Sequence, residues 1–310
     1  MHYNWLFTQV RANVEEIRHD GKRVCGVRVR KGATNLVYDI PAPVVVSTAG
    51  LYNTFEKLLP KTVACRSYFN GMADKIGPSA GAIYAFIGLN ASGEELNLPA
   101  ENVFWYLNPD NGECQFTDFE DLPREDALQN RIGVAFVGIQ SSKDPNWNKS
   151  PDNQNKSTMM VATGAPYKWF KEFEDSTLHK RGGNYEEIKA TLGQGLLDIA
   201  MDVYPQIKHH IDQVEYATPL TNNYYFGQNF GESYGMNANT ERFQDPWHVA
   251  KCRARTDIPG LYLSGQDVLT PGVLPGCLSA ITTASHILER NLLIDLLWIH
   301  VKNNGLKFHE

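Results

Sequence analysis

The chain has 310 residues, 42% of them hydrophobic and 21% charged, which is typical of globular domains and excludes disordered, collagenous and coiled-coil proteins. Lys and Arg number 29 against 35 Asp and Glu, and the resulting net charge of -6 argues against nucleic acid as a partner. The histidines and cysteines show no HExxH, HxH or CxxC spacing, so no metal site is predicted.

The first 60 residues predict two kinds of sheet. Residues 12–39 predict an antiparallel meander with a tight turn at 19–22. The β-branched run 43–50 predicts a strand that is buried on both faces in a parallel sheet. Apolar residues at helical spacing over 51–59 then predict a helix that ends before Pro60.

The middle of the chain predicts a mixed sheet. Apolar runs separated by polar loops occupy residues 82–89, 103–107, 132–139 and 158–163. One helix is predicted over 188–203, because apolar residues recur there every three to four positions and a proline follows.

The C-terminal segment predicts a strand over 260–267, a glycine loop over 271–276 and one long helix over 277–297. This order is typical of sites for phosphate-bearing cofactors, because glycines allow close backbone approach and a helix N-terminus attracts anions. An ordinary βα unit has the same pattern. Residues 292–301 are too few for a membrane span of about 18 residues, so they predict either packing on the core or contact with a membrane surface.

Three motifs point to one protein family. They are VVVSTAGLYNTFEKLLP at 44–60, TPLTN at 218–222 and GLYLSGQD at 260–267. With the helix that follows the third motif, they resemble the C-terminal half of FAD-dependent oxidoreductases of the phytoene desaturase and carotenoid isomerase type. The resemblance extends over nearly the whole chain.

The resemblance implies a mixed α/β fold, the C-terminal part of a Rossmann-like FAD-binding flavoprotein with an inserted mixed-sheet substrate domain. Residues 1–62 would form part of the FAD-binding domain, and residues 63–240 the substrate-binding domain. Residues 241–310 would supply the C-terminal strand, glycine loop and helix of the FAD-binding domain.

The resemblance also implies site residues. FAD contacts are expected at Val14, Thr48, Ala49, Gly50, Gly265, Asp267, Gly272, Val273, Leu274 and Gly276. Val14 would pack on the adenine, Asp267 would lie near the ribityl chain or the pyrophosphate, and Val273 and Leu274 would direct backbone N–H groups at the flavin. Substrate contacts are expected at Thr218, Thr221, Tyr224, Tyr225 and Phe226. No motif identifies a catalytic proton donor.

The implied activity is reduction of a double bond in all-trans-retinol or a related apolar isoprenoid, with NAD or NADP as the electron source. Peripheral membrane association at the endoplasmic reticulum is implied as well. No G-x-G-x-x-G phosphate loop occurs in the chain, so we expect a truncated part of such a flavoprotein. A desaturase or isomerase of the same family, and a non-catalytic fragment, stay open as alternatives.

Overall fold

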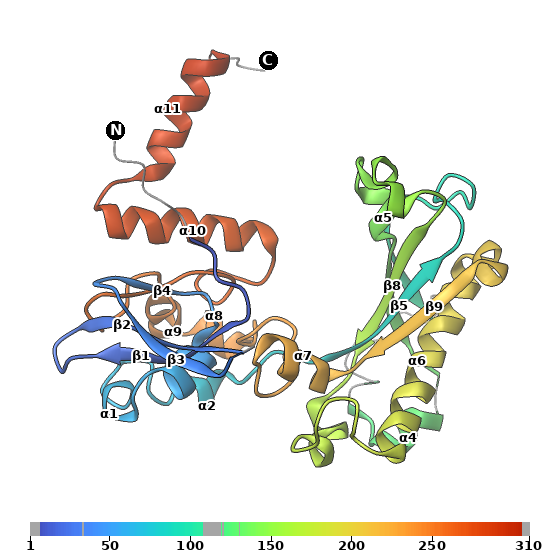
Figure 1. Ribbon diagram of the computed structural model, residues 1–310, viewed down its shortest axis with the longest axis horizontal. Helices are drawn as coiled ribbons and strands as arrows, with labels where there is room; N and C mark the ends of the chain where they lie inside the picture. The colour runs from blue at the N-terminus through green and yellow to red at the C-terminus, as the bar shows by residue number, and fades with distance from the viewer. Residues whose placement is uncertain (1–6, 33, 108–118, 120, 130, 306–310) are drawn as a thin grey trace. The chain divides into compact units, whose positions relative to one another are not determined.

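The computed structural model describes residues 7–32, 34–107, 119, 121–129 and 131–305 (Figure 1). The chain divides into two compact units: Met1–Ser79 with Tyr234–Glu310 form unit 1, and Ala80–Ser233 form unit 2. Unit 2 is therefore an insertion in the sequence of unit 1. The boundaries predicted from the sequence lie at 62/63 and 240/241, whereas unit 2 begins at Ala80 and ends at Ser233. Residues 63–79 belong to unit 1 because their apolar side chains, such as Phe69 and Met72, are buried in its core.

Unit 1 contains two sheets. Strands β1 (Ala12–His19), β2 (Val24–Lys31) and β3 (Leu36–Pro41) form the predicted antiparallel meander. At its first turn the Asp20 carboxylate accepts the N–H groups of Lys22 and Arg23, each at 2.8 Å, which lowers the pKa of that carboxyl. Strands β4 (Val45–Ser47) and β10 (Leu261–Leu263) form a separate parallel pair.

The prediction that β4 is buried on both faces is wrong. Val44 and Val46 are 39% and 43% exposed, whereas Ser47 is buried. Among the described residues β4 belongs to a two-stranded sheet, so it lacks the neighbours that would enclose it on both sides.

Unit 1 also contains short helices. They are η1 (Asn53–Leu58), α1 (Lys61–Ala64), α2 (Met72–Ile76), α8 (Thr240–Gln244) and α9 (Pro246–Lys251). The helix predicted over 51–59 is the π-helical η1, and it ends before Pro60 as expected. Its Phe55 packs with Ile17 of β1 and with Leu261 and Leu263 of β10 in one core.

Two helices replace the single long C-terminal helix of the sequence analysis: α10 (Val273–Leu288) and α11 (Leu292–Asn304). The helix α10 begins inside the predicted loop, because a proline in the first turn loses no hydrogen bond. It ends at Glu289, whose φ of 50° is left-handed, and the Asn291 side chain then caps α11 by accepting from Leu293 and Ile294 N–H. No described helix is long and apolar enough to cross a membrane.

Unit 2 is built on one five-stranded antiparallel sheet in the order β6-β7-β8-β5-β9. The strands are β5 (Ala82–Leu89), β6 (Asn102–Tyr106), β7 (Val134–Gly138), β8 (Ser157–Gly164) and β9 (Ile211–Ala217). The helices are α4 (Arg124–Gln129), α5 (Gln140–Lys143), α6 (Gly183–Val203) and α7 (Pro219–Phe226), with short 3-10 turns between them. The predicted mixed α/β class is confirmed.

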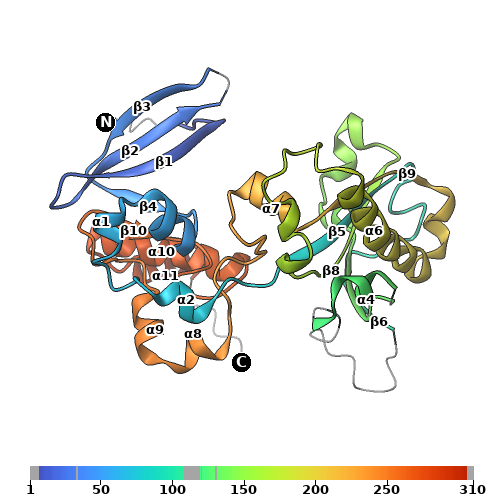
Figure 2. The same ribbon diagram turned by 90° about the horizontal axis from the view of Figure 1, so that it is seen from below.

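Helix α6 covers one face of this sheet (Figure 2). Its Ile188, Leu192 and Leu196 are buried against the strands, which explains the apolar period in the sequence. The helix lies so close that a Cβ on Gly193 would come within 2.4 Å of the Tyr216 ring in β9. Close packing therefore requires glycine at this position.

Candidate cofactor and substrate surfaces

The carboxyl ends of β4 and β10 lie side by side in unit 1. Val45 is paired with Leu261, and the Ser264 N–H donates to the Ser47 carbonyl at 3.0 Å. The segment that follows β4, Thr48 to Gly50, therefore lies next to Gly265, which follows β10. Ligands of open α/β sheets bind beyond the carboxyl ends of the strands, so this edge is the candidate cofactor surface of unit 1.

Asp267 anchors this edge. It is 4% exposed, and its two carboxylate oxygens accept the backbone N–H groups of Leu51 at 2.8 Å and Met236 at 3.0 Å. Each carboxylate oxygen has a second lone pair, so these bonds leave acceptor capacity. The predicted contact between Asp267 and a ribityl chain stays a prediction. The two hydrogen bonds show that Asp267 holds the backbone at Leu51 and Met236 together.

Arg242 supports the same edge and was not identified from the sequence. It is 1% exposed and donates to the carbonyls of Met236, Gln266, Asp267 and Leu269, the Asp267 bond being 2.8 Å long. A guanidinium has five donors in a fixed plane, so one side chain can join two loops. The nearby sequence contains no motif that marks this arginine for burial.

The N-terminus of α10 completes the candidate surface. Gly272 precedes the helix with φ at 122°, and Val273 and Leu274 in the first turn are 86% and 69% exposed. The first N–H groups of a helix have no partner within it and favour electron-rich ligand atoms. The buried Ser279 hydroxyl holds the helix in place by accepting the Gly265 N–H at 2.7 Å and donating to the Gly276 carbonyl.

The residues fit the flavin half of FAD. A Cβ on Gly265 would meet no described atom within 4 Å, so open space adjoins the backbone between the two strand ends. The buried Asn53 side chain donates to the Ala49 carbonyl, and its Oδ1 has no partner among the described residues. Val14 lies elsewhere in unit 1, opposite Val29 in the three-stranded sheet. Its predicted adenine contact stays a prediction.

The predicted substrate residues lie at helix α7 in unit 2. Thr218 and Thr221 form a capping box at its N-terminus, and the fully buried Thr218 hydroxyl also bonds the Tyr185 hydroxyl at 2.8 Å. Both threonines therefore have structural partners. Tyr224, Tyr225 and Phe226 are 59%, 64% and 71% exposed, and their predicted position along a substrate tunnel stays a prediction.

A second apolar surface in unit 2 was missed. On the sheet face opposite α6, one register row contains Phe104, Phe136, Ala162 and Tyr84 from four adjacent strands. The next row adds Met160 opposite Phe86. We call Tyr84, Phe86, Phe104, Phe136, Met160 and Ala162 the aromatic face.

The aromatic face is partly exposed, and a cavity lies at one part of it. Phe86 and Phe104 are 44% and 53% exposed, and Phe86 and Met160 line a cavity of about 510 Å³ together with polar residues that include Gln140, Gln213 and Glu215. Exposed apolar patches of this kind mark binding surfaces. The sequence signal for this surface was the large residues at every second position of the runs 82–89 and 103–107. Because both faces of these strands are apolar, the pattern alone does not show which face is in the core and which is at the surface.

Over 288 residues the chain is 35% identical to the all-trans-retinol 13,14-reductase of Rattus norvegicus and 33% identical to that of Homo sapiens, covering 92% of this chain and 46% of each relative. A Danio rerio protein named inactive all-trans-retinol 13,14-reductase is 31% identical over 275 residues. The chain thus spans about half the length of the curated relatives it matches. The resemblance predicted from the motifs is confirmed to that extent.

No family model matches the chain. Among solved structures, an oxidoreductase from Methanosarcina mazei aligns with 90% of this chain and 49% of its own length, at 14% identity and a TM-score of 0.47.

Proposed function

From its similarity to the all-trans-retinol 13,14-reductases, we propose that this chain carries flavin-facing and substrate-facing surfaces of an FAD-dependent oxidoreductase. The proposed reaction reduces the 13,14 double bond of all-trans-retinol or a related isoprenoid. The observation that carries the proposal is the identity of 33 to 35% over 92% of the chain. The aromatic face of unit 2 supports an apolar substrate.

The chain's own residues would hold and orient the reactants. Thr48 to Gly50, Gly265 and the first turn of α10 would hold the flavin half of FAD, with Asp267 and Arg242 keeping the two loops in register. Bound FAD supplies a hydride equivalent, with NAD or NADP proposed as the electron source. The N–H groups at the start of α10 favour negative charge beside them, because the N-terminal end of a helix dipole is positive.

The aromatic face would position the substrate. A polyene is long, flat and apolar, and aromatic rings bind such a surface by burying it and by offset stacking. Tyr84 and Phe86 lie with their rings 5.8 Å apart and nearly parallel, and Phe104 contacts Phe136 edge to face at 5.4 Å. These rings would cover one face of the bound polyene.

We also propose that α11 contacts a lipid surface. Its Leu293, Ile294, Leu297 and Trp298 are each more than half exposed. The Lys302 ammonium lies 5.1 Å from the centre of the Trp298 ring, a pairing suited to the boundary between apolar chains and charged headgroups. Location at the endoplasmic reticulum stays a prediction.

A chimera tests the proposed reaction. This chain replaces the matching segment of the rat reductase, and the purified product is examined for flavin absorption and for conversion of all-trans-retinol, followed by chromatography. We expect bound flavin and a product with one fewer double bond.

The unchanged rat protein, produced in the same way, is the control. A chimera that folds and binds FAD but leaves all-trans-retinol unconverted would overturn the proposed reaction. A chimera that folds without binding FAD would overturn the cofactor surface assigned to unit 1.

A further inference from the structure

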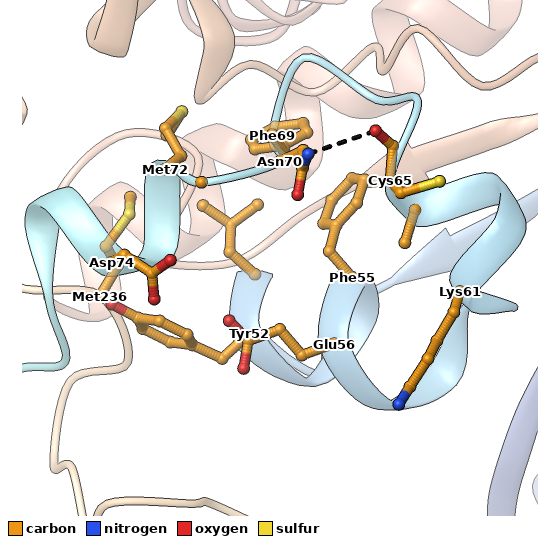
Figure 3. A pocket seen from close by; sticks show the side chains of 13 residues that line it. Tyr52, Phe55, Glu56, Lys61, Cys65, Phe69, Asn70, Met72, Asp74 and Met236 are labelled. Atoms are coloured by element: carbon orange, nitrogen blue, oxygen red, sulfur yellow. Dashed lines mark hydrogen bonds between the residues drawn. The ribbon is translucent and has the colours of Figure 1, made fainter.

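A pocket in unit 1 has no role in the proposed reaction. It encloses about 370 Å³ between η1, α1, α2 and Met236 (Figure 3). Leu51 and Met236, whose N–H groups bind Asp267, form part of its lining. The pocket is therefore built on residues that the Asp267 carboxylate holds in fixed positions.

The floor of the pocket is aromatic and thioether-rich. Tyr52, Phe55 and Phe69 are each at least nine-tenths buried, and the rings of Phe55 and Phe69 lie 4.2 Å apart. Met72 and Met236 add two further buried apolar side chains. Electron-rich ring faces and sulfur atoms bind alkyl groups and are also attractive to positive charge.

The rim of the pocket is acidic on one side. In Figure 3 the carboxylates of Glu56 and Asp74 both point toward the Tyr52 ring, whereas Lys61 extends from the other end of the pocket. Among the described residues neither carboxylate forms an ion pair. Burial and the Asp74 charge raise the pKa of Glu56, and Lys57 on the same helix offsets part of this effect.

We propose that this pocket binds a small organic cation with apolar substituents, of the quaternary ammonium class. The alkyl groups would occupy the aromatic floor, and the positive charge would lie beside the carboxylates of Glu56 and Asp74 at the rim. An anion is disfavoured by the same carboxylates, and a neutral molecule of the same shape would gain only the apolar contacts.

Choline is the probe, and its neutral isostere, with carbon in place of nitrogen, is the matched control. Each is titrated into the purified chain and followed by NMR. We expect choline to bind about tenfold more tightly than the isostere, as aromatic and carboxylate contacts to a cation predict.

Four variants locate the site. Glu56→Gln and Asp74→Asn should each weaken choline binding about threefold and leave the isostere unaffected. Lys61→Gln should strengthen choline binding, and Glu95→Gln in unit 2 should leave it unchanged. Equal binding of choline and isostere, no binding of either, or wild-type affinity in both carboxylate variants would each overturn the proposal.

Discussion

Gly235 leaves room for the carboxylate of Asp267. A Cβ on Gly235 would lie 2.6 Å from Asp267 Oδ1, and the φ of Gly235 is 68°. The same carboxylate oxygen accepts the N–H of Met236, the next residue along the chain. One buried acid thus holds two loops of unit 1 through their backbones, and it can do so because a glycine stands beside it.

Gly235→Ala should destabilise unit 1 for two reasons, the positive φ and the contact with Asp267. Gly71→Ala is the matched control, because Gly71 also has a positive φ of 74° while its Cβ would meet no described atom within 4 Å. Urea unfolding should show Gly235→Ala to be less stable than the control by about 1–3 kcal/mol. Equal losses of stability in the two variants would show that the Asp267 carboxylate can move away from the new Cβ without cost.

Arg242→Lys should destabilise unit 1, because an ammonium cannot span the four carbonyls that the guanidinium reaches. The expected loss in the free energy of unfolding is roughly 2–3 kcal/mol. Arg255→Lys, at an exposed position, should change stability by less than about 0.5 kcal/mol. Similar losses in both variants would contradict the anchoring role of Arg242.

Stability should fall in alkaline solution because of Cys252. Burial raises the pKa of this thiol from 9.0 to about 11, so the unfolded chain ionises first. The stabilisation is complete below pH 9 and is lost as the pH rises to about 11, a change of roughly 2–3 kcal/mol. Denaturant unfolding across this range should show a shallower pH dependence for Cys252→Ala. Identical slopes would contradict the assignment.

Phe86→Ser should weaken retinol binding to the chain, because the variant removes apolar contact area from the aromatic face. Retinol fluorescence should report an affinity roughly tenfold lower, which corresponds to about 1.4 kcal/mol. Trp247→Ser removes an aromatic ring that is 71% exposed in unit 1 and serves as the control. If both variants bind alike, the aromatic face is not the retinoid surface.

Leu297→Glu should release the chain from phosphatidylcholine vesicles, because it places a charge among the exposed apolar residues of α11. Leu36→Glu is the control, since Leu36 is 60% exposed on β3. Co-sedimentation measures the bound fraction. Undiminished sedimentation of Leu297→Glu would contradict lipid contact through α11.

Local sequence signals predicted most elements of the fold. The meander, the apolar runs of the middle sheet and the helix before Pro205 all depend on period and turn chemistry, which nearby residues determine. The C-terminal helix was predicted too long because Glu289 adopts a left-handed conformation that neither its residue type nor its neighbours signal.

The amino-acid sequence by itself determined most of the elements, the fold class and the similarity to the reductases. The resemblance to the flavoproteins also grouped Thr48 to Gly50 and Gly265 as expected FAD contacts. Only the tertiary structure decided that Arg242 is buried, that Asp267 joins Leu51 to Met236, and that Phe86 and Phe104 of the aromatic face are exposed. Each of these features depends on contacts between residues far apart in the chain. The segments that pack over an apolar or charged side chain decide whether it is buried.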